Sequence, residues 1–218
     1  MKKTSIFLLL SCILICATFA HTIDYELEKL DDGEVFSKYL NLGFTHILPL
    51  GLDHVLFILG IFFLNSDLKK IILQASMFTL AHSITLGLAV YGIIQPPSNL
   101  IEPLIALSIV FLALENLVAN SLKTWRILLV FLFGLIHGMG FAGALAELGL
   151  PKYAFANALI SFNIGVELGQ LTVIFVMYFL VARLFSEKTW YRKGIVIPAS
   201  VVIALIASYW TVERIFFT

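Results

Sequence analysis

The chain has 218 residues, of which 60% are hydrophobic and 13% charged, whereas soluble domains have roughly 45–50% apolar and 25% charged residues. This composition and a mean hydropathy of +0.99 exclude an ordinary soluble protein and predict an integral membrane protein. The 14 basic and 14 acidic residues cancel. No basic patch is dense enough to indicate a nucleic-acid partner, and none is expected.

The first 20 residues have the pattern of a secretory signal peptide. Two lysines precede an apolar run over residues 6–15, and small residues at 18–20 suit a cleavage site. An uncleaved first helix is the alternative. Both cysteines of the chain, Cys12 and Cys16, fall inside this segment, so a cleaved chain would offer a metal only nitrogen and oxygen ligands.

Residues 21–42 form a polar stretch with a net negative charge. We expect this stretch to be an exported acidic arm that precedes the membrane domain. One interpretation is a solvated, partly helical leader, and the other is a surface that collects cations before they enter the membrane.

Residues 43–218 contain apolar segments that are each long enough to cross a bilayer core of roughly 30 Å at about 1.5 Å per residue. These segments lie near 44–64, 70–93, 100–121, 126–148, 155–184 and 194–213. The predicted fold is therefore an all-α membrane protein, a six-helix transmembrane bundle in contact with lipid.

Basic residues gather in the loops after the first, third and fifth segments. They are Lys69, Lys70, Lys123, Arg126, Arg183, Lys188, Arg192 and Lys193. The opposite side has only Lys152 and Arg214 beyond the arm. By the positive-inside rule this asymmetry predicts a bacterial-type inner-membrane protein with both mature termini outside the cytoplasm.

Ionisable side chains inside predicted membrane helices are costly and need a partner or a function. Counting along the helices places most of them at one depth, near the midplane, where imidazole and carboxylate groups would bind a divalent metal ion. The predicted metal ligands are His46, Asp53, His54, His82, His137 and Glu167. The residues assigned to supporting roles around them are Glu115, Asn116, Asn163 and Gln170.

The first predicted helix contains a possible interruption at Pro49 and Gly51. In a continuous helix His46 and Asp53 would lie about 10 Å apart along the axis, so one ion could not bind both. Two interpretations follow. Either His46 is an outer capture site, or a break at Pro49 folds His46, Asp53 and His54 around one ion.

Small residues suggest close helix packing around two of these positions. Gly134 and Gly138 enclose His137, and Gly165 and Gly169 enclose Glu167, each pair at GxxxG spacing. The sequence Gly-Leu-x-His also occurs at both 51–54 and 134–137. This echo raises the hypothesis of an inverted repeat of three helices plus three.

Five motifs, one per helix, cover nearly all of residues 43–175. They are HILPLGLDH at 46–54, AHSIT at 81–85, LEN at 114–116, GLIHGMGFA at 134–142 and FNIGVELGQ at 162–170. These motifs resemble the HupE/UreJ family of hydrogenase and urease accessory membrane proteins. The resemblance implies a small metal permease for nickel or cobalt that works with metalloenzyme maturation proteins. In this chain six residues, rather than the five of the permease signature, separate His46 from Asp53.

Three functions remain open on the sequence. The first is a divalent-metal permease, for which no ATP-binding motif supplies an energy source. The second is a membrane-embedded hydrolase in which three histidines hold zinc and Glu115 or Glu167 acts as general base. The third is an accessory protein whose polar core is structural. Ligands strung along a path favour a permease, and a single tetrahedral site beside a cleft favours a hydrolase. The oligomeric state stays open.

Overall fold

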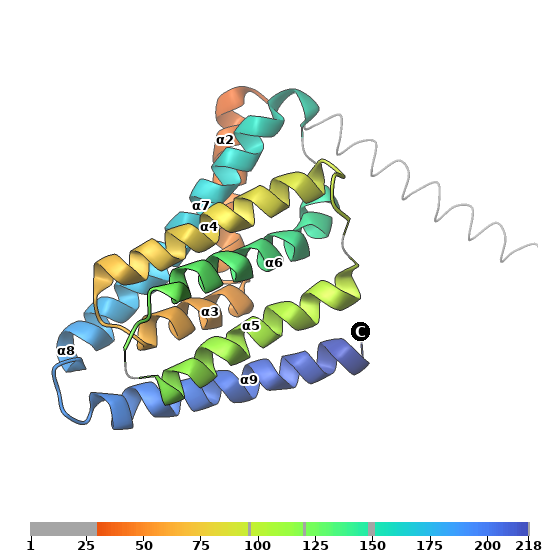
Figure 1. The fold of residues 1–218 in the computed structure, drawn as a ribbon. Coiled ribbons are helices and arrows are strands. Elements are labelled where there is room, and N and C mark those ends of the chain that lie inside the picture. The colour runs from red at the N-terminus through yellow and green to blue at the C-terminus, as the bar shows by residue number, and fades with distance from the viewer. Residues whose placement is uncertain (1–29, 96, 120, 148–150, 218) are drawn as a thin grey trace, which may run out of the picture.

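The computed structural model describes residues 30–95, 97–119, 121–147 and 151–217. The predicted signal peptide and the first part of the predicted arm lie outside the described residues. Within those ranges the chain is helical and has no strand (Figure 1). The main helices are α2 (Asp32–Ile47), α3 (Leu52–Phe63), α4 (Leu68–Val90), α5 (Ser98–Val118), α6 (Trp125–Glu147), α7 (Phe155–Met177) and α9 (Ile197–Phe216). The shorter turns are η1 (Lys152–Ala154), η2 (Tyr178–Ala182), α8 (Arg183–Phe185) and η3 (Arg192–Val196).

Five helical stretches are long and apolar enough to cross a membrane on their own, and a bent pair of helices makes a sixth. The five are Leu68–Val90, Ser98–Val118, Trp125–Gly143, Phe155–Phe185 and Arg192–Phe216. They match the second to sixth predicted segments closely. The prediction of an all-helical membrane protein is therefore confirmed.

The first predicted span, near 44–64, is interrupted in the structure, as one of the two interpretations of Pro49 and Gly51 expects. It consists of α2 and α3, bent by 66° at the break between them. Moreover, α2 begins at Asp32, inside the predicted arm, because Asp31 and Glu34 form a capping box. The Asp31 carboxylate accepts from the Glu34 N–H at 2.8 Å, and the Glu34 carboxylate accepts from the Asp31 N–H at 3.0 Å.

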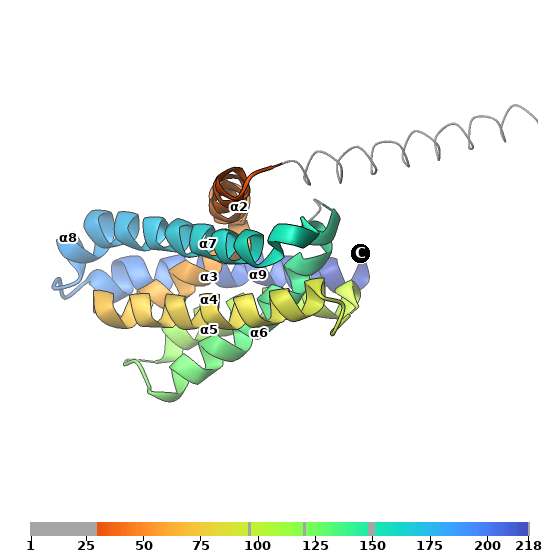
Figure 2. The same ribbon diagram turned by 90° about the horizontal axis from the view of Figure 1, so that it is seen from above.

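The helices pack in three close pairs, α2 on α7, α4 on α6 and α5 on α9 (Figures 1 and 2). Both GxxxG spacings lie at such contacts, as the sequence predicts. A Cβ atom at Gly165 would collide with the Leu40 carbonyl of α2, and one at Gly138 would collide with the His82 carbonyl of α4. Glycine is needed there because the two backbones touch.

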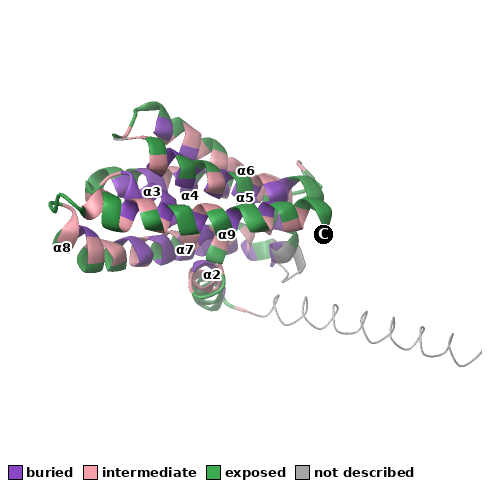
Figure 3. Cartoon of the chain, turned by 90° about the horizontal axis from the view of Figure 1, so that it is seen from below, coloured by how far each residue is buried: buried purple, intermediate pink, exposed green. Residues whose placement is uncertain are grey.

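The short helix α3 lies in the interior and contacts α4, α5, α7 and α9. Its 12 residues extend only about 18 Å, too short to cross a bilayer core of roughly 30 Å. Figure 3 shows buried positions between the helices and exposed positions on their outward faces, which include large apolar residues such as Leu80, Ile160 and Leu205. Such an apolar exterior suits contact with lipid. The start of α3 therefore lies inside the bundle.

Candidate metal centre

The break between α2 and α3 brings the two helix ends together in the interior. Pro49 has no N–H for a helical hydrogen bond, so α2 ends at Ile47. Gly51 precedes α3, and a Cβ atom at this position would collide with the His46 carbonyl. The tight return of the chain therefore requires glycine. As a result, residues seven or eight positions apart in the sequence become neighbours in space.

Three histidines meet at this break. The imidazole centroids of His46 and His54 are 4.6 Å apart, and that of His82 on α4 lies 6.2 Å and 5.9 Å from them. One ring nitrogen from each residue lies within 4.8 Å of the others. We call His46, His54 and His82 the histidine cluster. The break between α2 and α3 therefore brings His46 and His54 together, as the broken-helix interpretation expects, and that they bind one ion stays a prediction.

The ring nitrogens that face the histidine cluster are buried and poorly hydrogen-bonded. Within the part of the chain that the structure describes, His46 Nε2 and His54 Nε2 have no hydrogen-bond partner, and the ring of His82 interacts with the side chain of Asn163 without a hydrogen bond of ordinary geometry. His82 is fully buried, and His54 is 7% exposed. A buried polar atom without a partner is costly. Converging unpartnered nitrogens thus indicate a ligand.

His137 on α6 lies beside the histidine cluster but outside the group of three. Its ring centroid is 5.3 Å from that of His54, and it packs against Phe57 and Phe78 at 4.9 Å each. Its Nδ1 atom lies 2.8 Å from the Phe133 carbonyl. This contact leaves Nε2, which is buried and unbonded among the described residues, on the other side of the ring. His137 can therefore serve as a fourth nitrogen or as a support.

Asp53, a predicted ligand, is engaged elsewhere. Its carboxylate accepts from Arg214 of α9 at 2.7 Å, and the Arg214 guanidinium also donates to the Glu102 carbonyl of α5 at 3.2 Å. This ion pair is partly buried, with side-chain exposures of 18% for Arg214 and 26% for Asp53. The structure does not bring Asp53 into the group of converging nitrogens.

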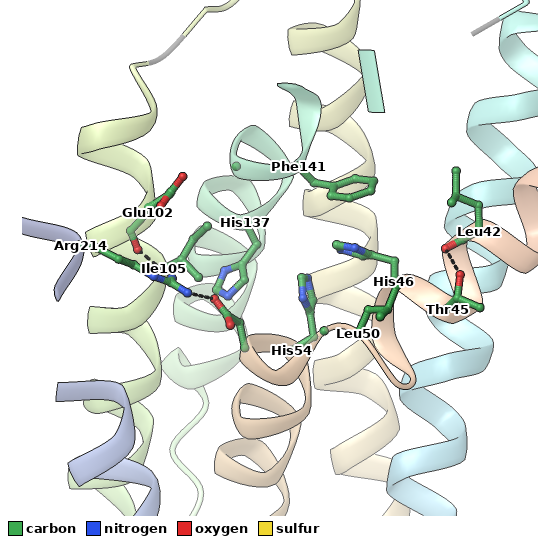
Figure 4. A pocket seen from close by; sticks show the side chains of 13 residues that line it. Leu42, Thr45, His46, Leu50, His54, Glu102, Ile105, His137, Phe141 and Arg214 are labelled. Atoms are coloured by element: carbon green, nitrogen blue, oxygen red, sulfur yellow. Dashed lines mark hydrogen bonds and ion pairs between the residues drawn. The ribbon is translucent and has the colours of Figure 1, made fainter. Parts of the chain in front are cut away.

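A cavity of about 390 Å³ adjoins the histidines. Figure 4 shows the imidazoles of His46, His54 and His137 directed toward it, with Phe141 above and Arg214 at one side. Two of the lining residues mark its position: Glu102 lies near the beginning of α5, and Arg214 lies near the end of α9. The cavity therefore lies toward the end of the bundle where α5 begins and α9 ends (Figure 1).

Glu167, also predicted as a ligand, does not line this cavity. Its carboxylate accepts from Ser76 on α4 at 2.6 Å. Together with Asn163 it lines a second groove, between α4 and α7. Gln170, one turn further along α7, donates to the Thr79 hydroxyl at 3.0 Å. Of the predicted supporting residues of α7, Gln170 therefore lies near Glu167, whereas Asn163 lies between Glu167 and His82 of the histidine cluster.

Glu115 and Asn116 lie in a third place, at the ends of α3, α5 and α6. Arg126 is fully buried, lies 3.4 Å from the Glu115 carboxylate and donates to the Gly60 carbonyl at 2.9 Å. Asn116 donates to the same carbonyl at 3.0 Å. We call these residues the arginine cluster. Arg126, counted from the sequence among the basic residues of the loop after the third segment, lies instead in the first turn of α6, which begins at Trp125, and is buried.

The histidine cluster suits a borderline divalent metal ion. A tetrahedral ion with bonds of roughly 2.0–2.1 Å holds imidazole nitrogens about 3.3 Å apart. The three nitrogens lie within 4.8 Å of one another, so a movement of each nitrogen by about 1 Å, through rotation of its ring, would reach that spacing. Nitrogen ligands favour nickel, cobalt or zinc over magnesium or calcium, which prefer oxygen. Zinc as a catalytic ion would leave a fourth position facing the cavity.

The model of the family described as "HupE / UreJ protein" matches residues 22–214. The chain belongs to the HupE/UreJ family. No curated protein and no solved structure gives a significant match. The HupE/UreJ match covers the described helices from α2 onward, except for the last two residues of α9, and it points to a nickel- or cobalt-related accessory protein of the membrane.

Sequence reasoning missed two partners of the predicted site, Arg214 and Ser76. Arg214 has a signal, because an arginine in the last turn of a membrane helix needs an anion or a route to water. That signal predicts a carboxylate partner for Arg214 but does not identify Asp53 as that partner. Ser76 has no such signal, since serine in a membrane helix usually bonds to its own backbone.

Proposed function

We propose that this chain is a HupE/UreJ-type permease for a divalent transition metal, nickel or cobalt, and that the ion binds at the histidine cluster. One observation carries the proposal: unpartnered nitrogens from two broken half-helices and α4 converge within 4.8 Å. Broken helices at the midplane are a recurring way to build an ion site in transporters. Imidazole ligands without thiolates also release an ion more readily than cysteine would.

The direct test is uptake of radiolabelled nickel and cobalt into liposomes that contain the purified protein. We expect uptake above that of protein-free liposomes, and its loss in a His54→Gln variant that still elutes as a folded, monodisperse protein. The matched control is Thr172→Ala, which removes a half-buried hydroxyl of α7 that donates to the Leu168 carbonyl of its own helix and does not line the cavity. No uptake of any divalent ion by the wild-type protein would refute the permease.

A second candidate is a membrane metallohydrolase, because the histidine nitrogens form one group beside a cavity of about 390 Å³. Neither Glu115 nor Glu167 lines that cavity, so the general base of such an enzyme would be one of the two carboxylates that do line it, Glu102 or Asp53, and Asp53 pairs with Arg214. One tightly held zinc ion per chain, with no transport, would favour this function over the permease.

The membrane topology is part of the proposal. With both mature termini outside the cytoplasm, the cavity toward the end of α9 would open to the exported side, from which the ion enters. Single cysteines introduced at Lys188 and at Phe217 test this, because we expect a membrane-impermeant thiol reagent to label only the second in intact cells. The family also suggests metalloenzyme maturation proteins as partners on the cytoplasmic side.

A further inference from the structure

The groove between α4 and α7 is a second polar feature inside the membrane-spanning region. It has a volume of about 410 Å³. Its polar walls come from Ser76, Thr79 and Ser83 of α4 and from Asn163 and Glu167 of α7. Its rim is apolar and includes the exposed side chains of Leu80, Ile160 and Ile164. We call it the glutamate groove.

The glutamate groove contains more free acceptors than donors. The hydroxyl hydrogens are used in bonds from Ser76 to Glu167 Oε1, from Thr79 to the Ala75 carbonyl and from Ser83 to the Thr79 carbonyl. The Asn163 amide nitrogen donates to the Leu159 carbonyl. Glu167 Oε2 and Asn163 Oδ1 are buried, and among the described residues neither has a hydrogen bond of ordinary geometry. Buried oxygens of this kind call for a cation.

A purely structural contact between α4 and α7 would not need this arrangement. The Ser76 bond uses one carboxylate oxygen, and a glutamine would make the same bond without placing a charge in the membrane. The second oxygen is the part of Glu167 that the helix contact does not explain. Asn163, one turn away on the same helix, has an amide oxygen without a hydrogen bond of ordinary geometry, and its side chain also interacts with His82, so the two residues could share a ligand.

The groove adjoins the histidine cluster. The side chain of Asn163 lies against His82 closely enough to interact with it. Ser76 precedes His82 by six residues, or about 9 Å along α4, toward the end that carries Lys69 and Lys70. That end is opposite to the one at which the cavity beside the histidines lies (Figure 1). The two polar sites therefore follow one another across the bundle.

We propose that Glu167, Asn163 and Ser76 form a second and weaker binding site for the same divalent ion, which we call the second station. An ion leaving the histidines past His82 would meet oxygen ligands, which hold nickel and cobalt less tightly than imidazoles do. Conduction requires several sites, none of them too tight to leave. The rim of the groove is apolar and offers a cation no ligand on the lipid side, so the ion would move on along α4. This inference rests on the proposed permease function.

The test compares Glu167→Gln with wild-type protein in two measurements. Titration calorimetry with cobalt in detergent counts tight and weak equivalents, and liposome uptake measures transport. In Glu167→Gln we expect the tight equivalent to bind within twofold of wild type, the weak equivalent to disappear, and uptake to fall at least tenfold. Glu187→Gln, which neutralises an exposed carboxylate, is the matched control and should change none of these values.

Ser76→Ala provides a second variant should Glu167→Gln fold poorly, and it should weaken the second equivalent several-fold. Wild-type uptake in Glu167→Gln would overturn the second station, and so would loss of the tight equivalent, since Glu167 would then belong to the histidine site. If the wild-type protein transports no ion, the proposed permease function is refuted, but the second station is not. The second station then depends on binding alone: a weak equivalent that Glu167→Gln removes supports it, and its absence in wild type overturns it.

Discussion

The histidine cluster and the arginine cluster are both buried and polar, yet their chemistry differs. In the arginine cluster a cation meets an anion, and the Gly60 carbonyl accepts from both Arg126 and Asn116. In the histidine cluster three groups of one kind face each other, with no carboxylate in the group. The first arrangement balances its own charge and holds three helices together. The second brings together imidazole nitrogens without a countercharge, which suits the binding of an added cation.

This comparison predicts that the arginine cluster matters for stability and not for metal binding. Arg126→Met should lower the free energy of unfolding by about 3–5 kcal/mol, because it leaves the Glu115 carboxylate buried and unpaired. Unfolding by SDS in mixed micelles measures this. Removing the carboxylate as well, in Arg126→Met/Glu115→Leu, should restore most of the loss. If Arg126→Met is as stable as wild type, the structural role is wrong.

The opposite effect is expected at the histidine cluster. His82→Gln removes one of three ligands and should weaken nickel or cobalt binding by at least about 100-fold. Loss of a residue that only hydrogen-bonds to a metal ligand typically costs about 10- to 100-fold. Isothermal titration in detergent gives the affinity, and the unfolding curve of the metal-free variant serves as the control. Unchanged affinity would mean that the converging nitrogens do not bind the ion.

The ion pair beside the cavity should have a smaller effect, of the opposite sign. Arg214→Gln removes a positive charge from the cavity wall and frees the Asp53 carboxylate, so metal binding should tighten by about tenfold, or roughly 1.4 kcal/mol. Arg183→Gln is the control, because Arg183 lies over Phe179 and away from the cavity. Weaker binding in Arg214→Gln would show that Asp53 needs Arg214 to keep the site in shape.

The smallest effect is expected at Thr85, which lies one turn from His82 but binds only backbone. Its hydroxyl donates to the Leu135 carbonyl of α6 at 2.8 Å. Thr85→Val should cost about 0.6 kcal/mol of stability, typical of hydrogen bonds between membrane helices, and should leave metal affinity within twofold. A large loss of affinity would extend the metal site to the hydroxyl groups of α4.

Much of the fold could be predicted from the sequence, because long apolar segments leave few choices for a chain in a membrane. The limits of five spans agree with the prediction to within a few residues. The extent of the first span could not be predicted. The buried face of α2, which includes Val35 and Tyr39, begins within an otherwise charged stretch. Because the mean hydropathy of that stretch is low, it does not reveal that the helix begins there.

For the site, the presence of polar groups inside the helices was predictable, but the direction of each side chain was not. His46, His54 and His82 lie together, as one of the two interpretations of the break at Pro49 expects, whereas the other placed His46 at an outer site. Glu167, predicted at the same depth as the histidines, bonds to Ser76, which lies six residues before His82 on α4, or about 9 Å along the helix. Counting residues at 1.5 Å each gives height in the membrane, whereas the rotation of each helix depends on packing, here on contacts such as that of Gly165 with Leu40. The inverted repeat stays a prediction.

X-ray absorption spectroscopy of the cobalt- or nickel-loaded protein tests the central claim, that the histidine cluster holds the ion, most directly. For wild-type protein at one equivalent, we predict at least three nitrogen scatterers with the multiple-scattering pattern of imidazole, and one imidazole fewer in His82→Gln. A metal shell made only of oxygen, or an imidazole count that His82→Gln leaves unchanged, would contradict this account.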